Sequence, residues 1–302
     1  MSEPGPRDHL ATERANPLSA ELDVLATGDA FDLFQSEDEG AALAVRAARA
    51  EIVRAIDLVA DRLGRGGRLV YVGAGTSGRL GALDASECPP TFGSDPAQVQ
   101  AVIAGGAAAL AGPVEGAEDD EDAARRELAA RGVGALDVVF GIAAGGTTPF
   151  VHAALAEARE RGAATVMLAC VPRGDAPDAA DVSIRIPTGP ELVAGSTRLK
   201  AGTVTKLVLN RVTTLAMVAL GKVHGNLMVE VTTRANAKLR ERGISLVVTL
   251  TGLGRGAAAE LLERADGEVK TATVMHAHAL DADAARARLA AADGRLRDAL
   301  AS

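Results

Sequence analysis

The residues best suited to chemistry begin in a glycine-rich stretch. Residues 73–79 read GAGTSGR, so the hydroxyl groups of Thr76 and Ser77 lie among three glycines and precede Arg79. Backbone N–H groups can approach an anion closely where glycine removes the Cβ atom. The pattern predicts a phosphate-binding loop, with a purely structural turn as the alternative. Its candidate ligands are Gly75, Thr76, Ser77, Gly78 and Arg79.

A carboxylate follows this loop closely. Glu87 stands between Ser86 and the sequence Cys88-Pro89-Pro90. Because proline cannot donate a helical hydrogen bond, we expect the helix that leaves the loop to end at Glu87. A glutamate fixed at that point could act as a general acid or base. The alternatives are an ordinary exposed glutamate and Asp84 as the acting carboxylate.

A second acidic stretch, residues 115–122, reads EGAEDDED. Clustered acids usually form a solvated first turn of a helix, where the helix dipole favours negative charge. Glu115 and Glu118 lie one helical turn apart and could share a face, so one of them could be a second catalytic carboxylate. The spacing does not match a calcium-binding loop and the histidines are scattered, so we expect no metal site.

Two further polar loops follow predicted strands. Residues 144–149 read AGGTTP, and the hydroxyl groups of Thr147 and Thr148 could hold an anion where Pro149 opens a helix. Residues 195–200 read GSTRLK, where Ser196 and Lys200 could act in the same way. Ordinary helix capping is the alternative for both loops.

Two nucleotide-binding interpretations fail on the sequence. The spacing Gly73-x-Gly75-x-x-Gly78 fits a dinucleotide-binding fingerprint, which also needs an acidic residue at the end of the second strand. That strand is followed by Ala104-Gly105-Gly106 and no acid. The lysine with serine or threonine that closes a P-loop is absent as well. A nicotinamide or flavin cofactor is therefore not expected.

The elements that must position these residues form an alternating pattern. Short apolar runs between helix-forming stretches predict an α/β fold, with a parallel sheet covered on both faces. Expected strands are residues 69–72, 99–103, 138–142, 165–171 and 182–186, and the helices between them are 79–85, 117–130 and 150–161. Apolar spacing predicts longer helices over 40–63, 196–220 and 227–240. Ligands of such sheets bind at the carboxyl ends of the strands.

Four parts are expected along the chain. Residues 1–57 form an N-terminal helical segment that packs on the core, and residues 58–222 form the sheet domain. Residues 223–242 form a linking helix, and residues 243–302 form a small C-terminal helical bundle. A bundle of that size is marginally stable alone.

Composition limits the partners. The net charge is -8, only 2% of residues are aromatic and Trp is absent, which argues against nucleic acid. No apolar run approaches the ~20 residues that span a bilayer, and the polar residues 1–17 lack the regions of a signal peptide. We expect a cytoplasmic protein without membrane contact, in which Cys88 and Cys170 are buried thiols.

Several long segments together resemble one known family. They are TERANP at 12–17, GAGTSGRLGALDASECPPTFG at 73–93, VEGAEDD at 114–120, GSTRLKAGTVTKLVLN at 195–210 and GKVHGNLMVEV at 221–231. Nearly end to end, the chain is similar to the N-acetylmuramic acid 6-phosphate etherase family, which has the SIS (sugar isomerase) fold. The glucokinase regulator of animals, which is not an enzyme, is similar over parts of the same segments.

The resemblance implies an activity and its residues. Family members hydrolyse the D-lactyl ether of N-acetylmuramic acid 6-phosphate in cell-wall recycling, form homodimers and need no cofactor. By motif, the two catalytic glutamates fall on Glu87 and Glu118, and the phosphate loop falls on residues 75–78. Glu87 is then the proton donor to the departing lactate, and Glu118 is the base at C2 or in ring opening. In place of AGGTTP the family usually shows ASGRTP, so a serine and an arginine are missing here.

Two other functions fit the same fold. One is a non-catalytic sensor of sugar phosphates, which would bind a phosphosugar without converting it. The other is an aldose-ketose isomerase, which would convert a phosphosugar without releasing lactate.

Overall fold

The computed structural model describes residues 9–301, in two compact units. The first unit holds the chain up to Ser86 together with Ala97–Thr213, and the second holds Glu87–Pro96 with Thr214–Ser302. Residues 1–8 lie outside the described residues. They belong to the expected helical segment 1–57 and to residues 1–17, for which no signal peptide is expected. The four-part division expected from the sequence stays a prediction.

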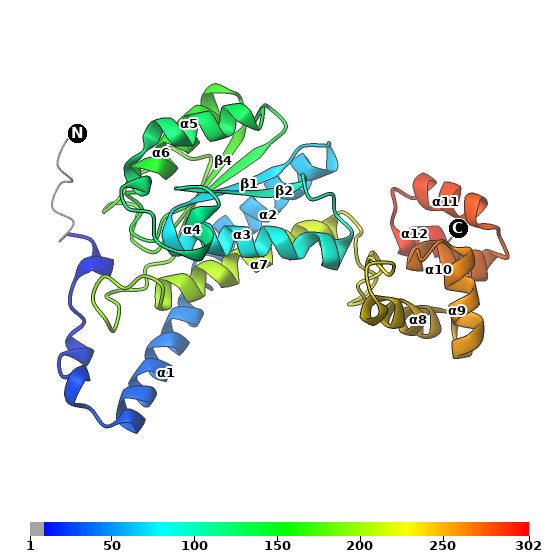
Figure 1. Cartoon of the computed structure of the whole chain (residues 1–302), viewed down its shortest axis with the longest axis horizontal. Coiled ribbons are helices and arrows are strands. Elements are labelled where there is room, and N and C mark those ends of the chain that lie inside the picture. Colours follow the sequence, from blue (N-terminus) through cyan, green and yellow to red (C-terminus); the bar gives the residue numbers. More distant parts are fainter. Residues whose placement is uncertain (1–8, 302) are drawn as a thin grey trace. The chain divides into compact units, whose positions relative to one another are not determined.

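A five-stranded sheet forms the centre of the first unit (Figure 1). The strands are β1 (Leu69–Gly73), β2 (Val99–Ile103), β3 (Val138–Ile142), β4 (Ala164–Ala169) and β5 (Val182–Arg185). Their order is β2-β1-β3-β4-β5 and each pairing is parallel. Gly73 lies opposite both Ile103 and Ile142, so the carboxyl ends of three strands meet at one edge. The predicted α/β class and the five strands are confirmed.

Helices cover both faces of this sheet. Figure 1 shows α5 (Glu121–Ala130) and α6 (Pro149–Glu160) on one face, and α2 (Arg49–Gly64) with α3 (Gly75–Phe92) on the other. Because side chains alternate along a strand, Val72 of β1 joins Leu128 and Val151 in an apolar cluster on the first face. Tyr71 points to the other face, where a Cβ added to Gly81 of α3 would lie 2.9 Å from the Cβ of Tyr71.

The remaining elements of the first unit frame the sheet. They are η1 (Ala11–Glu13), η2 (Pro17–Ser19), η3 (Leu22–Val24), α1 (Thr27–Ala44), α4 (Ala108–Ala111), η4 (Ala117–Asp119) and most of α7 (Lys200–Ala219). The predicted single helix over residues 40–63 is wrong, because α1 ends at Ala44 and α2 begins at Arg49. Backbone bonds between residues three apart form a turn there, and Val45 and Ala48 are buried in it. Burial in a turn produced the apolar spacing that predicts a longer helix.

The second unit is helical. It contains α8 (Ala237–Thr251), α9 (Arg255–Arg264), α10 (Val269–His278), α11 (Ala282–Ala291) and α12 (Leu296–Ala301), packed around one apolar cluster. Over residues 9–301, no single helix has the length and apolar character to cross a bilayer, although α8 and α9, bent by 108°, together pass that test.

The helix expected over residues 227–240 does not form as predicted. The first helix in this part of the chain is α8, which begins at Ala237. Asn236 caps α8 by accepting a hydrogen bond from the Leu239 N–H at 2.9 Å. Val229, Val231 and Thr233 are all buried. This alternation has the period of an extended chain and not of a helix, which explains the error.

Candidate functional site

The glycine-rich loop is the start of a helix. α3 begins at Gly75, directly after β1, so Thr76 and Ser77 lie in its first turn and are half-buried. The first N–H groups of a helix have no partner within it, and the helix dipole places partial positive charge there. This end of α3 can therefore hold an anion, as the sequence predicts.

Packing explains Gly78, and backbone conformation explains Gly75. A Cβ on Gly78 would lie 2.5 Å from Cγ1 of Ile103 and 2.6 Å from the carbonyl oxygen of Gly73, so α3 can approach the sheet only without a side chain there. Gly75 has a positive φ of 52°, which favours glycine. Gly78 thus fixes the helix start against the ends of β1 and β2, which is a different role from opening space for a ligand. Nothing lies within 4 Å of the point where a Cβ of Gly75 would stand.

Arg79 lies in the next turn of α3 and reaches the loop after β2. Its Nη2 donates a hydrogen bond to the carbonyl oxygen of Gly112 at 2.9 Å. The segment beyond Gly112 carries Glu115 and Glu118. Arg79 thus connects the anion-binding helix start to the acidic segment.

Glu87 is an exposed residue within α3, and the prediction that the helix ends there is wrong. α3 continues through Pro89 and Pro90 to Phe92, although neither proline can donate a helical bond. Cys88 and Phe92, one turn apart, are buried, and this burial offsets the lost bonds. Glu87 lies eleven residues beyond Thr76 on one helix, about 16 Å along its axis at 1.5 Å per residue.

Asp84, the alternative carboxylate, has a structural environment. It is buried and accepts hydrogen bonds from the Tyr71 hydroxyl at 2.9 Å and from Nδ2 of Asn210 at 2.7 Å. The hydroxyl of Thr213 lies 3.3 Å from the same carboxylate. Asp84 therefore ties α3 to β1 and α7, and Glu87 is the more accessible carboxylate of the two.

The acidic segment is not one helical face. Gly116 has a positive φ of 70°, so no helix runs from Glu115 into the short helix η4 that carries Glu118. The prediction that these two carboxylates share a helix face is therefore wrong. Both residues are exposed, and η4 contacts α6. Further along, Asp120 caps α5 by accepting a hydrogen bond from the Ala123 N–H at 2.8 Å, which confirms that part of the stretch opens a helix.

The loop after β3 ends at the start of α6, where Pro149 occupies the first turn as predicted. Thr147 and Thr148 are half-buried, and the side chain of Thr148 makes no capping hydrogen bond. Arg185, at the carboxyl end of β5, lies beneath this loop, with Nη1 3.2 Å from the Cβ position of Gly146. The carboxylate of Asp178 accepts hydrogen bonds from Ser183 and Arg185. Burial alone would raise the pKa of Asp178, but these hydrogen bonds outweigh burial and lower that pKa.

The third polar loop has a partner within the protein. Glu191 is fully buried, and its carboxylate accepts hydrogen bonds from the N–H groups of Lys200 at 3.0 Å and Ala201 at 2.9 Å. The Lys200 ammonium is buried in an ion pair with Glu37 of α1, and Ser196 lies half-buried in the preceding turn. The start of α7 therefore binds the protein's own carboxylate. Unlike the other two loops, this loop does not offer its helix start to an external anion.

Distances in the ordinary van der Waals range show that parts of the three loops lie near one another. Cγ2 of Thr76 lies 3.7 Å from the Cβ position of Gly202 on α7. Oγ1 of Thr12 lies 3.7 Å from the Cβ position of Gly145, and Oε2 of Glu13 lies 3.5 Å from that of Gly195. The sequence gives no role to Thr12 or Glu13. Both residues lie in the segment TERANP, which the chain shares with the family that it resembles, and this shared segment is the signal that could have identified them.

Other groups are accounted for structurally. Cys88 and Cys170 are buried free thiols, as predicted, and burial raises the pKa of Cys170 to about 12. Among residues 9–301, no three His, Cys, Asp or Glu side chains gather in a way that could hold a metal ion.

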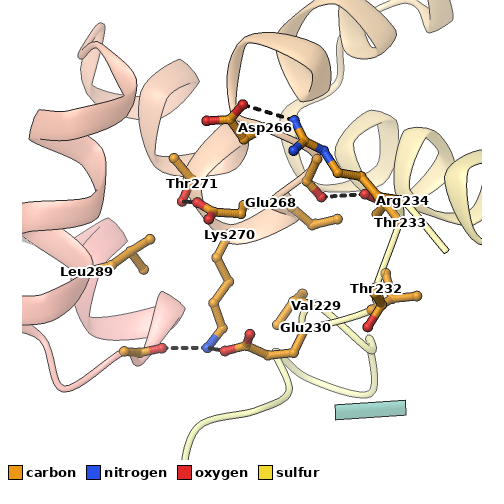
Figure 2. Close-up of a pocket in the computed structure, with 14 residues that line it drawn as sticks. Val229, Glu230, Thr232, Thr233, Arg234, Asp266, Glu268, Lys270, Thr271 and Leu289 are labelled. Carbon is orange, nitrogen blue, oxygen red and sulfur yellow. Dashed lines mark hydrogen bonds and ion pairs between the residues drawn. The ribbon is translucent and has the colours of Figure 1, made fainter. Parts of the chain in front are cut away.

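A cavity of about 350 Å³ lies in the second unit, and none of the predicted site residues lines it (Figure 2). Figure 2 shows the Lys270 ammonium beside Glu230, and it also donates to the carbonyl oxygens of Gly221 and Gly294. Arg234 pairs with Asp266 at 2.9 Å. The two cationic side chains that line this cavity, Lys270 and Arg234, are thus already paired with carboxylates and hold the second unit together.

Comparison with known proteins gives full-length relatives. The chain is 57% identical to the N-acetylmuramic acid 6-phosphate etherase of Gloeobacter violaceus, over 97% of this chain and 96% of that protein. It is 55% identical to the protein of that name from Trichormus variabilis (98% and 96% covered) and 51% identical to that from Synechocystis sp. (97% and 96% covered).

Two broader matches concern the sheet domain. Residues 51–159 match the family described as the glucokinase regulatory protein N-terminal SIS domain. Among solved structures, a phosphoheptose isomerase from Francisella tularensis is 16% identical with a TM-score of 0.50, covering 64% of this chain and 98% of that chain. At this identity the likeness shows the fold alone.

Proposed function

The chain belongs to the N-acetylmuramic acid 6-phosphate etherase family, and on that basis we propose that it cleaves the D-lactyl ether of N-acetylmuramic acid 6-phosphate. The products are N-acetylglucosamine 6-phosphate and D-lactate. The observation that carries the proposal is 57% identity to a protein of that name over 97% of this chain. The retained carboxylates Glu87 and Glu118, and the anion-binding start of α3, support it.

We assign the steps as follows. The phosphate binds the N–H groups and hydroxyls of residues 75–78, while the open-chain sugar presents its C1 aldehyde. The aldehyde acidifies the C2–H bond, Glu118 removes that proton, and the C3–O bond breaks as Glu87 protonates the departing lactate oxygen. Glu87, now a carboxylate, takes a proton from water whose oxygen adds to C3. Protonated Glu118, which exchanges its proton with solvent, returns a proton to C2. Arg79, Thr147 and Thr148 are proposed to orient the sugar phosphate, with Glu115 at the same edge.

We assign Ser196 and Lys200 more remote roles. The Lys200 ammonium is committed to Glu37 and its N–H to Glu191, so these residues fix the loop beside Thr76. Their effect on substrate is then exerted through the position of α7.

A homodimer is part of the proposal, and helix geometry supports it. Glu87 lies about 16 Å along α3 from Thr76, whereas the phosphate and C3 of the sugar are separated by less than half that length. One substrate molecule therefore cannot contact both ends of the same α3. We propose that the helix start of one subunit and Glu87 of a second copy serve one substrate molecule.

Mixing two variants tests this arrangement. Ser77→Asp places a negative charge at the helix start and Glu87→Gln removes the acid, so each homodimer should be inactive. A co-expressed heterodimer purified through two different tags should regain roughly half of the wild-type activity, because one of its two sites then has both groups intact. A heterodimer as inactive as its parents would place both groups in one chain and contradict the shared site.

Incubation with N-acetylmuramic acid 6-phosphate in deuterated water tests the function. An etherase releases D-lactate and leaves deuterium at C2 of the product. A sensor binds the phosphosugar and releases nothing, and an isomerase changes the sugar without releasing lactate. We propose a cytoplasmic location as well, since a charged phosphosugar does not cross a bilayer unaided.

A further inference from the structure

A buried hydroxyl near the start of the described chain has no partner. The side chain of Thr12 is 0% exposed, and its Oγ1 makes no hydrogen bond to any described residue. Leaving a buried polar group unpaired costs folding free energy, so native proteins leave few of them. Such an atom next to a binding edge calls for a ligand.

The position of Thr12 is fixed by its neighbours. Leu10 is 1% exposed and belongs to the same apolar cluster as Val72 and Phe150, under the carboxyl ends of the strands. The Glu13 N–H donates to the carbonyl oxygen of Leu10 at 3.1 Å, so η1 follows at once. Asn16 then bonds to the carbonyl oxygen of Pro190 at 3.1 Å. The segment is held at both ends over the edge where the polar loops meet.

The hydroxyl faces a glycine. Oγ1 of Thr12 and Oγ1 of Thr147 lie 3.7 Å and 3.9 Å from the point where a Cβ of Gly145 would stand, and Cδ1 of Leu10 lies 3.4 Å from it. Gly145 is half-buried, so part of this loop is open to solvent. The next residues open α6, whose positive end favours an anion and whose Thr148 makes no capping bond. A Leu10 methyl group, two hydroxyls and a helix start thus border the position beside Gly145, which has room for a single added atom.

We propose that Thr12 is a substrate-binding residue whose hydroxyl bonds an oxygen of the phosphosugar, a phosphate oxygen or a sugar hydroxyl, in the space beside Gly145. The inference rests on the proposed function, since it takes the phosphosugar as the ligand. It gives the N-terminal segment a direct part in binding, alongside its packing on the core.

Thr12→Val, which has nearly the same shape without the hydroxyl, tests the proposal. The loss of one hydrogen bond to a substrate oxygen should raise KM about tenfold and leave kcat close to wild type. The melting temperature should stay the same or rise, because an unpaired polar atom is removed. Thr12→Ser keeps the hydroxyl and should keep the wild-type KM. Thr273→Val is the matched control: its buried hydroxyl bonds the Val269 carbonyl oxygen at 2.8 Å, so stability should fall and KM should not change.

Inorganic phosphate as a competitive inhibitor separates the two oxygen sources. Weaker inhibition of Thr12→Val by phosphate points to a phosphate oxygen, and unchanged inhibition with a raised KM points to a sugar hydroxyl. A Thr12→Val enzyme with wild-type KM, or one that unfolds early or fails to fold, overturns the proposal. If the wild type releases no lactate, the proposed function fails separately. Calorimetric binding of glucosamine 6-phosphate to wild type and Thr12→Val then decides the role of Thr12.

Discussion

Replacing Glu191 with glutamine tests how the start of α7 is held. Glu191 is 0% exposed, and each of its carboxylate oxygens accepts one backbone N–H, from Lys200 at 3.0 Å and from Ala201 at 2.9 Å. Glutamine keeps one acceptor oxygen but turns an NH2 group toward the other N–H. One buried N–H is then unpaired, which costs about 1–3 kcal/mol. Loss of the negative charge at a helix start adds about 0.3–2 kcal/mol.

The expected total is a loss of about 1–5 kcal/mol in the free energy of unfolding. Urea titration followed by far-ultraviolet circular dichroism measures it, because the chain has no Trp and only one Tyr for fluorescence. Glu263→Gln is the control: its carboxylate is 75% exposed and pairs with Arg240 at 3.3 Å, so its loss should cost less than about 1 kcal/mol. If Glu191→Gln were within about 0.5 kcal/mol of wild type, the buried cap would not hold α7 as reasoned.

Two further predictions concern the sheet domain. Gly78→Ala should destabilise the protein by about 1–3 kcal/mol and raise KM, because its Cβ would meet Ile103 at 2.5 Å and the Gly73 carbonyl oxygen at 2.6 Å; a wild-type melting temperature would contradict this packing. Burial alone would raise the pKa of Asp137, but hydrogen bonds from the Arg68 side chain and the Gly134 N–H outweigh burial and hold it below the usual range. The unfolded state then binds more protons in acid, so this stability is present above about pH 4 and lost as pH falls through the folded-state pKa. Urea midpoints across that range should fall less steeply for Asp137→Asn, and an unchanged acid slope would count against the Arg68–Asp137 pair.

The sheet could be predicted from the sequence because its strands are buried on both faces. A run such as Val138–Ile142 is apolar throughout, and such a run predicts a buried strand whichever elements later pack against it. The glycine-rich start of α3 is also local, since strand, glycines and hydroxyls are neighbours in sequence. These features need no knowledge of distant residues.

The features that were missed depend on distant contacts. α3 passes through Pro89 because Cys88 and Phe92 find buried positions, which a local proline rule does not include. Glu191 reaches a helix start nine residues later, and Thr12 reaches a loop more than a hundred residues away. No spacing rule links such pairs, so the candidate site was predicted as three equal loops, whereas one of them is already capped by the protein.

The most direct measurement is the rate of D-lactate release from N-acetylmuramic acid 6-phosphate by Glu87→Gln beside wild type. Removing a general acid should lower kcat by about a hundredfold or more, while competitive inhibition by inorganic phosphate stays at the wild-type level because the start of α3 is untouched. A Glu87→Gln enzyme that releases lactate at the wild-type rate would contradict the assignment of this carboxylate.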